Sequence, residues 1–198
     1  MFSLEDLLGQ QQGNQAVEQI SHSLGANSAV TSSAIQMALP MILGALTKNA
    51  QQPQGAEALS NTLQKNHDGG ILDNLGGFLG NNQQANDDGL GILGHIFGNK
   101  QGAVAQQVSQ NSGLDVGQVA QLLITLAPIV MGFLGKKKQE QNLDAGGLSN
   151  MLGEQQQQMQ TAGNPMMDMV SGFFDKDKDG SSMDDLASMA ASYFQQKR

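Results

Sequence analysis

The chain has no cysteine, no tryptophan and one tyrosine among its 198 residues. The absence of cysteine excludes disulfides and thiolate metal ligands. Aromatic residues make up only 4% of the chain, so the core must be built from Leu, Ile, Val, Met and Ala, most of which favour helices over strands. We therefore expect an all-α fold. The chain contains 25 glycines but only 4 prolines, so glycine should mark most of the breaks between helices.

Positive charge is also scarce, with 10 Lys and Arg against 18 Asp and Glu and a net charge of −8. Because nucleic-acid binding requires a basic face, we expect no nucleic-acid partner. The one basic run, Lys136–Lys138, follows an apolar segment, where cations stabilise a helix C-terminus. The first residues are acidic and lack the basic flank and apolar stretch of a secretory signal, so we expect a cytoplasmic protein.

One long hydrophobic run is present, at residues 119–135. Its length is roughly that needed to span a bilayer. A similar segment at residues 34–46 is too short to do so, and both segments contain a proline near the middle. We therefore favour a buried core helix over a transmembrane helix for residues 119–135.

The two apolar segments belong to an internal duplication. Pro40 and Pro128 are 88 positions apart, and so are Gly44 and Gly132. Further matches follow in the same order: Ile20 with Val108, Gly25 with Gly113, and Leu59-Ser-Asn-Thr-Leu63 with Leu148-Ser-Asn-Met-Leu152. This ordered series predicts a tandem repeat of a unit with several helices.

Each unit is predicted to contain three helices. A glycine ends the first helix, Gly25 in one unit and Gly113 in the other. Asn27 or Ser28 should begin the second helix of the first unit, and Asp115 with Gln118 forms a capping-box pattern in the second. The mid-segment prolines are expected to kink or break these second helices. The third helices carry the Leu-Ser-Asn-x-Leu pair.

A glycine-rich connector joins the units, with apolar segments at residues 69–80 and 88–98. Such sequences have low intrinsic helicity, but they form short helices when packed. We favour short core helices packed closely through their glycines. The alternative is a membrane-binding or partner-binding amphipathic helix, which should carry Lys or Arg on its polar face; neither segment has any.

The sequence Asp175-Lys-Asp177-Lys-Asp179-Gly-Ser181 has the alternating acids and following glycine of an EF-hand-type calcium loop. The predicted ligands are Asp175, Asp177, Asp179, the Ser181 carbonyl, and Asp184 or Asp185 as the closing acid. Apolar residues at helical spacing on both sides predict a helix–loop–helix. Leu186 replaces the usual closing glutamate, so we expect weak Ca²⁺ binding, with a dissociation constant of roughly 10⁻⁵–10⁻³ M. The alternative is an acidic turn beside a helix N-terminus.

A catalytic set is not apparent in the sequence. The three histidines, His22, His67 and His95, have no neighbouring metal-ligand or catalytic partner. We predict that His95 is a partly buried histidine with a structural role. No phosphate-binding glycine loop is followed by a lysine. We therefore expect a protein that is not an enzyme.

Three motifs resemble a known family. They are Gly91-Ile-Leu-Gly-His-Ile-Phe-Gly98, Ser112-Gly-Leu114, and Leu126-Ala-Pro-Ile-Val-Met-Gly132. In these the chain resembles the bacterial YidB-like family, a domain family of unknown function, over most of residues 1–160. The resemblance implies a small all-helical fold of two related halves, and it implies no reaction. The segment Phe173–Gly180 looks like the Phe-x-Asp-x-Asp-x-Asp-Gly tail of many members.

Together these patterns predict an all-α chain in four parts. Residues 1–66 and 102–160 are the repeat units, 67–101 the connector, and 161–198 the calcium-binding tail. The predicted function is that of a non-catalytic binding or scaffold protein with a structural Ca²⁺ site, acting through an unidentified protein partner or self-association. The alternatives are a peripheral membrane protein that uses the glycine-rich segments, and an enzyme with an unrecognised site.

Overall fold

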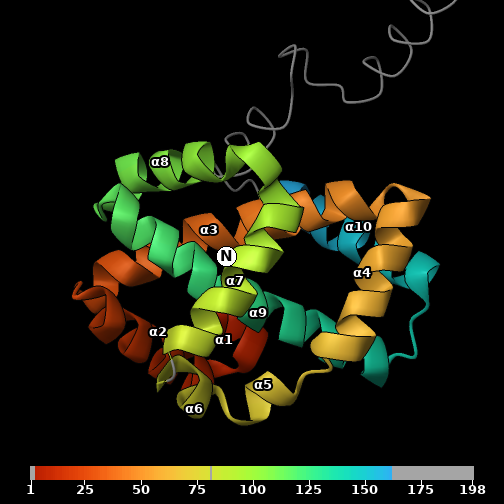
Figure 1. The fold of residues 1–198 in the computed structure, drawn as a ribbon, viewed down its shortest axis with the longest axis horizontal. Helices are drawn as coiled ribbons and strands as arrows, with labels where there is room; N and C mark the ends of the chain where they lie inside the picture. The colour runs from red at the N-terminus through yellow and green to blue at the C-terminus, as the bar shows by residue number, and fades with distance from the viewer. Residues whose placement is uncertain (1–2, 81, 162–198) are drawn as a thin grey trace, which may run out of the picture.

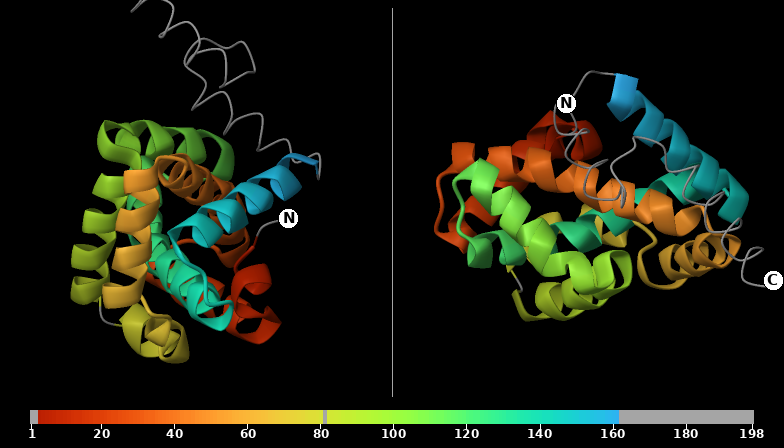
Figure 2. Two further views of the ribbon diagram at one scale, coloured as in Figure 1. Left: turned by 90° about the vertical axis from the view of Figure 1, so that its right-hand side faces the viewer. Right: turned by 90° about the horizontal axis from the view of Figure 1, so that it is seen from above.

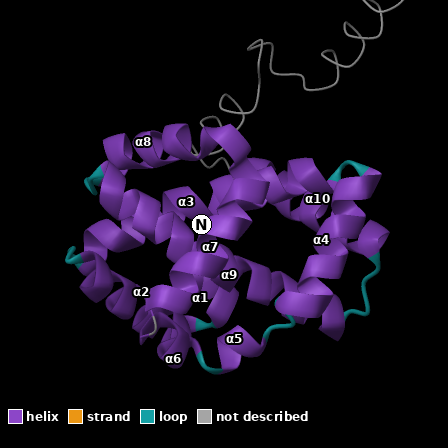
Figure 3. Ribbon diagram, viewed as in Figure 1, coloured by secondary structure: helices purple, strands orange, loops and turns teal. Residues whose placement is uncertain are grey.

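In the computed structural model, residues 3–80 and 82–161 are described, and within them the chain is helical with no strand (Figures 1 and 3). The prediction of an all-α fold is confirmed. The elements are α1 (Leu4–Leu8), α2 (Gln10–Leu24), α3 (Ser28–Ala50), α4 (Pro53–Asn66), α5 (Gly70–Asp73), α6 (Leu75–Gly80), α7 (Asn82–Phe97), the 3₁₀ turn η1 (Gly98–Lys100), α8 (Gln101–Ser112), α9 (Val116–Glu140) and α10 (Ala145–Thr161).

The two long apolar helices, α3 and α9, form the centre of the molecule. All residues from 38 to 47 in α3 and from 125 to 132 in α9 are buried, and the other helices surround them (Figure 2). Both helices are long and apolar enough to cross a membrane by length and composition, but 67% of the apolar window of α3 and 61% of that of α9 is buried inside the protein. The apolar side chains of α3 and α9 therefore pack in the protein core.

A glycine in the left-handed conformation follows the first helix of each predicted unit. α2 ends at Gly25 with φ 62° and α8 ends at Gly113 with φ 87°, a left-handed conformation that glycine adopts without steric cost. The Asn27 side chain then accepts a hydrogen bond from the Ala29 amide. At the corresponding position Asp115 and Gln118 form a complete capping box. The local sequence thus specifies both helix starts.

The prolines do not end their helices. Pro40 lies inside α3, which continues to Ala50, and Pro128 lies inside α9, which continues to Glu140. Of the two outcomes predicted for these prolines, the break does not occur. The residues that follow each proline are buried in the core, and burial of this apolar surface offsets the backbone hydrogen bond that proline removes.

The third helices connect the two halves of the chain. α10 packs against α3 and α4, and α4 also contacts α9. The Ser149 hydroxyl of α10 donates to the Ala50 carbonyl oxygen at 2.9 Å, and both Leu148 and Leu152 are buried. A single hydrophobic core contains residues from both halves. The division at residues 66, 101 and 160 stays a prediction about sequence units, which share this core.

The glycine-rich connector forms α5, α6 and α7, which pack onto the body. A Cβ atom at Gly135 of α9 would overlap the carbonyl oxygen of His67, and one at Gly89 of α7 would overlap the carbonyl oxygen of Ile124. α7 lies along α9 (Figure 1). Gly89 belongs to the connector, so the close packing through connector glycines that the sequence suggested is present between α7 and α9.

Candidate functional site

The predicted calcium ligands Asp175, Asp177, Asp179, Ser181, Asp184 and Asp185 all lie outside the described residues. Calcium binding accordingly stays a prediction, as does the helix–loop–helix around the loop. Within residues 3–80 and 82–161, no group of three or more His, Asp or Glu side chains is placed to hold a metal ion.

A groove of about 660 Å³ lies between α4 and α7. Its walls come from these two helices, and α3 and α9 contribute to its floor. Four side chains give the floor its apolar character, and each is at most 9% exposed: Leu46, Leu59, Ile92 and Met131. Their burial fixes the shape of the floor, since each packs into the common core.

Polar side chains form the rim of the groove, in contrast to its apolar floor. They are Asn49, Gln52, Thr62, Asn66, His67, Asp87, Asp88 and His95. The Asn49 side-chain amide donates to the carbonyl oxygens of His95 and Ile96, at 3.4 Å in each case. These bonds tie the end of α3 to the end of α7 and define one end of the groove.

The environment of His67 in the groove changes the protonation of its side chain. Partial burial lowers the pKa of its imidazole below the usual value of 6.5, against the opposing effect of Asp88 and Asp68. The imidazole is therefore neutral at pH 7, with one nitrogen that donates a hydrogen bond and one that accepts. Such a group suits recognition of a polar ligand atom.

The structure brings together side chains that have no neighbouring functional partner in the sequence. His67 follows α4 and His95 lies in the last turn of α7, yet both line one groove with Asp87 and Asp88. His95 is exposed, so the prediction that it is partly buried is wrong. No local pattern could have revealed this site, because its residues meet only through the packing of α4 and α7 over the core.

Two glycines shape the groove in opposite ways. Gly55 allows the start of α4 to approach α3, because a Cβ atom there would overlap the carbonyl oxygen of Asn49. Gly91 of α7 faces open space, and a Cβ atom there would meet nothing within 4 Å. The groove therefore has unfilled volume beside Gly91.

The groove has the chemistry of a binding site. Its buried apolar floor can accept an apolar side chain, while the exposed carboxylates of Asp87 and Asp88 can accept hydrogen bonds from a cation. Its one hydroxyl, on Thr62, donates to the Ala58 carbonyl oxygen at 2.8 Å. That bond lies within α4 and does not pair the hydroxyl with a histidine base, as nucleophilic catalysis would need.

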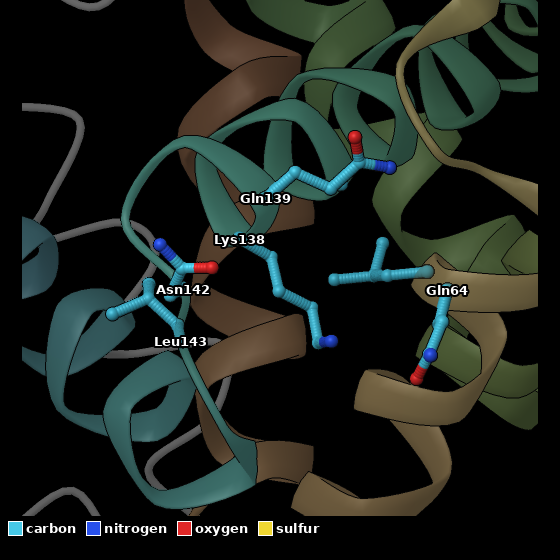
Figure 4. Close-up of a pocket in the computed structure, with 7 residues that line it drawn as sticks. Gln64, Lys138, Gln139, Asn142 and Leu143 are labelled. Atoms are coloured by element: carbon cyan, nitrogen blue, oxygen red, sulfur yellow. The ribbon is translucent and has the colours of Figure 1, made fainter.

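A second cavity, of about 420 Å³, lies between α4, the end of α9 and the turn before α10 (Figure 4). Lys138 extends into it from α9, with Gln64, Gln139 and Asn142 around it. The preceding Lys137 binds Glu140 at 3.0 Å. The lysine run thus lies in the last turns of α9, where cations interact favourably with the helix C-terminus.

Comparison with curated proteins and with solved structures gave no match in either case. A family model, described as bacterial protein of unknown function (DUF937), matches residues 6–137. The matched region runs from α1 to near the end of α9 and includes both walls of the groove between α4 and α7. The chain therefore belongs to the DUF937 family of bacterial proteins of unknown function.

Proposed function

We propose that the protein is a non-catalytic binding protein whose site is the groove between α4 and α7. The observation that carries this proposal is the combination of a buried apolar floor with a rim that includes two exposed carboxylates. Concave sites of this size, largely apolar with a few convergent polar groups, are typical of ligand binding.

The rim favours a ligand that is apolar on one side and cationic on the other. Asp87 and Asp88 supply negative charge beside the floor residue Ile92, and the whole chain carries a net charge of −8. The net negative charge of the chain attracts a basic ligand at long range, and the two carboxylates can pair with it in the groove, so both effects favour a basic ligand. An amphipathic basic segment of a partner protein has this chemistry.

A peptide of leucine and lysine with an amphipathic helical pattern is a direct probe, and the same peptide with glutamate for lysine is its charge control. We expect fluorescence anisotropy to show binding of the lysine peptide only. Gly91→Phe should weaken binding at least about tenfold by filling the groove. Gly94→Phe is the matched control, because Gly94 is on the same helix, does not line the groove and also faces open space. Equal binding by the two variants would contradict the proposal.

The proposal retains a structural Ca²⁺ site in the tail, supported by the alternating aspartates Asp175, Asp177 and Asp179. Calorimetric titration of the full chain with Ca²⁺ should show binding in the range expected for a weak loop, and Asp177→Asn should weaken or abolish it. Titration with Mg²⁺ tests ion selectivity. Absence of a Ca²⁺ signal in the unmodified chain would remove the site from the proposal and leave the groove untouched.

The finer assignment to the YidB-like family and a cytoplasmic location are part of the same proposal. The motifs at residues 91–98 and 126–132 support the family assignment. The burial of most of the apolar windows of α3 and α9 supports their use as core helices.

One observation favours peripheral membrane binding as a second candidate function. Leu90 of α7 is 53% exposed in a glycine-rich apolar segment. Co-sedimentation with vesicles of phosphatidylcholine, with and without phosphatidylglycerol, tests this alternative, and Leu90→Asp should reduce pelleting. If the unmodified protein does not pellet with either vesicle, membrane binding is excluded as the function of this face.

A further inference from the structure

The C-terminal residues repeat the sequence of the connector. Ile71-Leu-Asp-Asn-Leu-Gly-Gly-Phe78 corresponds to Met166-Met-Asp-Met-Val-Ser-Gly-Phe173 at an offset of 95 positions. The aspartate, the second glycine and the phenylalanine are identical, and the other positions keep their apolar or small character except where Asn74 is replaced by Met169. This first match covers α5 and most of α6.

A second match covers α7 and η1. Asp87-Asp88 corresponds to Asp184-Asp185 at an offset of 97 positions, and the same offset relates Phe97 to Phe194 and Lys100 to Lys197. Between these points, several small or apolar residues of the first copy correspond in sequence to small or apolar residues of the second. The pairs are Gly91 and Ser188, Ile92 and Met189, Leu93 and Ala190, Gly94 and Ala191, and Ile96 and Tyr193. The duplication thus extends past the two three-helix units and includes the connector.

The aspartate loop lies where the two copies differ in length. Phe78 and Asp87 are 9 positions apart, whereas Phe173 and Asp184 are 11 positions apart. The two additional residues fall in the stretch that contains Asp175–Gly180. In sequence, residues 166–197 therefore correspond to the connector, and the aspartate loop occupies the position of the length difference.

The packing of the described helices indicates where a second α7 belongs. α8 contacts α3 as its counterpart α2 contacts α9, and α10 contacts α3 as its counterpart α4 contacts α9. The helices of the first half therefore contact α9 in the same way that the corresponding helices of the second half contact α3. α7 of the first half lies along α9 of the second, so the corresponding partner for its copy is α3.

One face of α3 corresponds in sequence to the face of α9 that contacts α7. Gly89 of α7 lies against the Ile124 carbonyl oxygen, and the counterpart of Ile124 on α3 is Gln36. Gln36 and Met37 are half-buried and Ser33 is exposed. Gly89 of α7 corresponds to Leu186 in the second copy. Because leucine has a side chain and glycine has none, the second copy cannot approach α3 as closely as α7 approaches α9.

We propose that residues 183–197 bind along α3 over Ser33, Gln36 and Met37, in the way that α7 binds along α9. The chain is long enough for this contact: 21 residues (162–182) separate α10 from this segment, against 19 residues (67–85) between α4 and its counterpart 86–100. The occupant is thus the chain's own C-terminal segment. The proposal is independent of the ligand in the groove and of Ca²⁺ binding.

The sequence correspondence between α7 and residues 183–197 also predicts which side chains make the contact with α3. Ile92, Leu93 and Phe97 of α7 are 9%, 3% and 6% exposed, so their counterparts Met189, Ala190 and Phe194 face α3. Gly94 is exposed, and its counterpart Ala191 faces away.

Two aspartate variants of the full chain test this assignment. Phe194→Asp should lower Tm by about 5 °C or more, because it places a charge in the contact, whereas Ala191→Asp should leave Tm unchanged. Measurement in EDTA separates the contact from any effect of Ca²⁺. Equal Tm values for both variants and the unmodified chain would overturn the proposal.

A spin label at Ser33→Cys locates the segment directly. The chain has no native cysteine, so the label is unique. We expect the amide signals of residues 183–197 to broaden within a single molecule. In a mixture of labelled ¹⁴N chains and unlabelled ¹⁵N chains they should stay sharp. Broadening in the mixture would mean that a second copy supplies the segment, and no broadening in either sample would mean that α3 is not its partner; either result would overturn the proposal.

Discussion

Thr31 differs from its counterpart in the duplication by one buried hydroxyl. Both Thr31 and Val119, which is 88 positions further along, are 0% exposed. The Thr31 hydroxyl has no hydrogen-bond partner among the described residues. Because a buried polar atom without a partner loses its hydration and gains nothing in return, the valine of the second unit fits this position better than the threonine of the first.

We expect Thr31→Val to raise the free energy of unfolding by about 1 kcal/mol, since it removes the unpaired hydroxyl with little change of shape. Thr47→Val is the matched control. The Thr47 hydroxyl is equally buried but donates to the Leu43 carbonyl oxygen at 2.8 Å, so its removal should bring no gain. Urea unfolding of the two variants decides the question, and a loss of stability in Thr31→Val would show that its hydroxyl is satisfied in solution.

His67 should make stability depend on pH. Burial lowers the pKa of its imidazole in the folded protein, so below about pH 6.5 the unfolded chain binds a proton more readily than the folded chain does. The free energy of unfolding is therefore expected to fall as the pH decreases from 7.5 through 6.5. His67→Gln should reduce the dependence of the free energy of unfolding on pH. His22→Gln is the control, because it removes an exposed histidine elsewhere in the protein. An unchanged slope in His67→Gln would argue against the burial effect.

At the scale of elements, glycines decide which helices come close together. Gly135 of α9 receives the carbonyl oxygen of His67, whereas a Cβ atom at Gly153 of α10 would meet nothing within 4 Å. Neither residue has a positive φ. The two glycines therefore differ in what surrounds them and not in their backbone conformation.

The same substitution should consequently have opposite effects at these positions. Gly135→Ala is expected to destabilise the protein by about 1–3 kcal/mol, because the new methyl group displaces the segment between α4 and α5. Gly153→Ala should stabilise it by about 0.5–1 kcal/mol through higher helix propensity. Thermal unfolding followed by circular dichroism compares them, and equal effects would mean that helix propensity outweighs packing at Gly135.

The three-helix order was readable at this scale because its signals are local. Gly25, Asn27 and the pair Asp115 and Gln118 act within a few residues of themselves, and they bound the helices where the sequence predicts. Pro128 shows the limit of such reasoning. Proline removes one backbone hydrogen bond wherever it stands inside a helix, but the burial that offsets this loss depends on residues distant in the sequence.

At the scale of the whole molecule, the two halves should unfold together. α10 packs on α3 and α4 of the first half, and Leu152 of α10 is 1% exposed. Leu152→Ala should lower the free energy of unfolding by about 2–5 kcal/mol in one transition that includes both halves. NMR signals from α2 and α8 report on the halves separately, and Glu154→Ala is an exposed control on the same helix. A loss confined to α10 would show that the halves are not coupled.

The sequence alone determined the helical class, the duplication, the ends of α2 and α8 and the starts of α3 and α9, because composition and capping act over short distances along the chain. It could not reveal the groove, whose residues His67, Asp88 and His95 carry no shared local pattern. Only the tertiary structure decided that α3 and α9 use their apolar length as a common core, that each third helix contacts the other half, and that α4 and α7 leave a groove between them. These features depend on contacts between residues far apart in the chain, where shape and burial outweigh local preference.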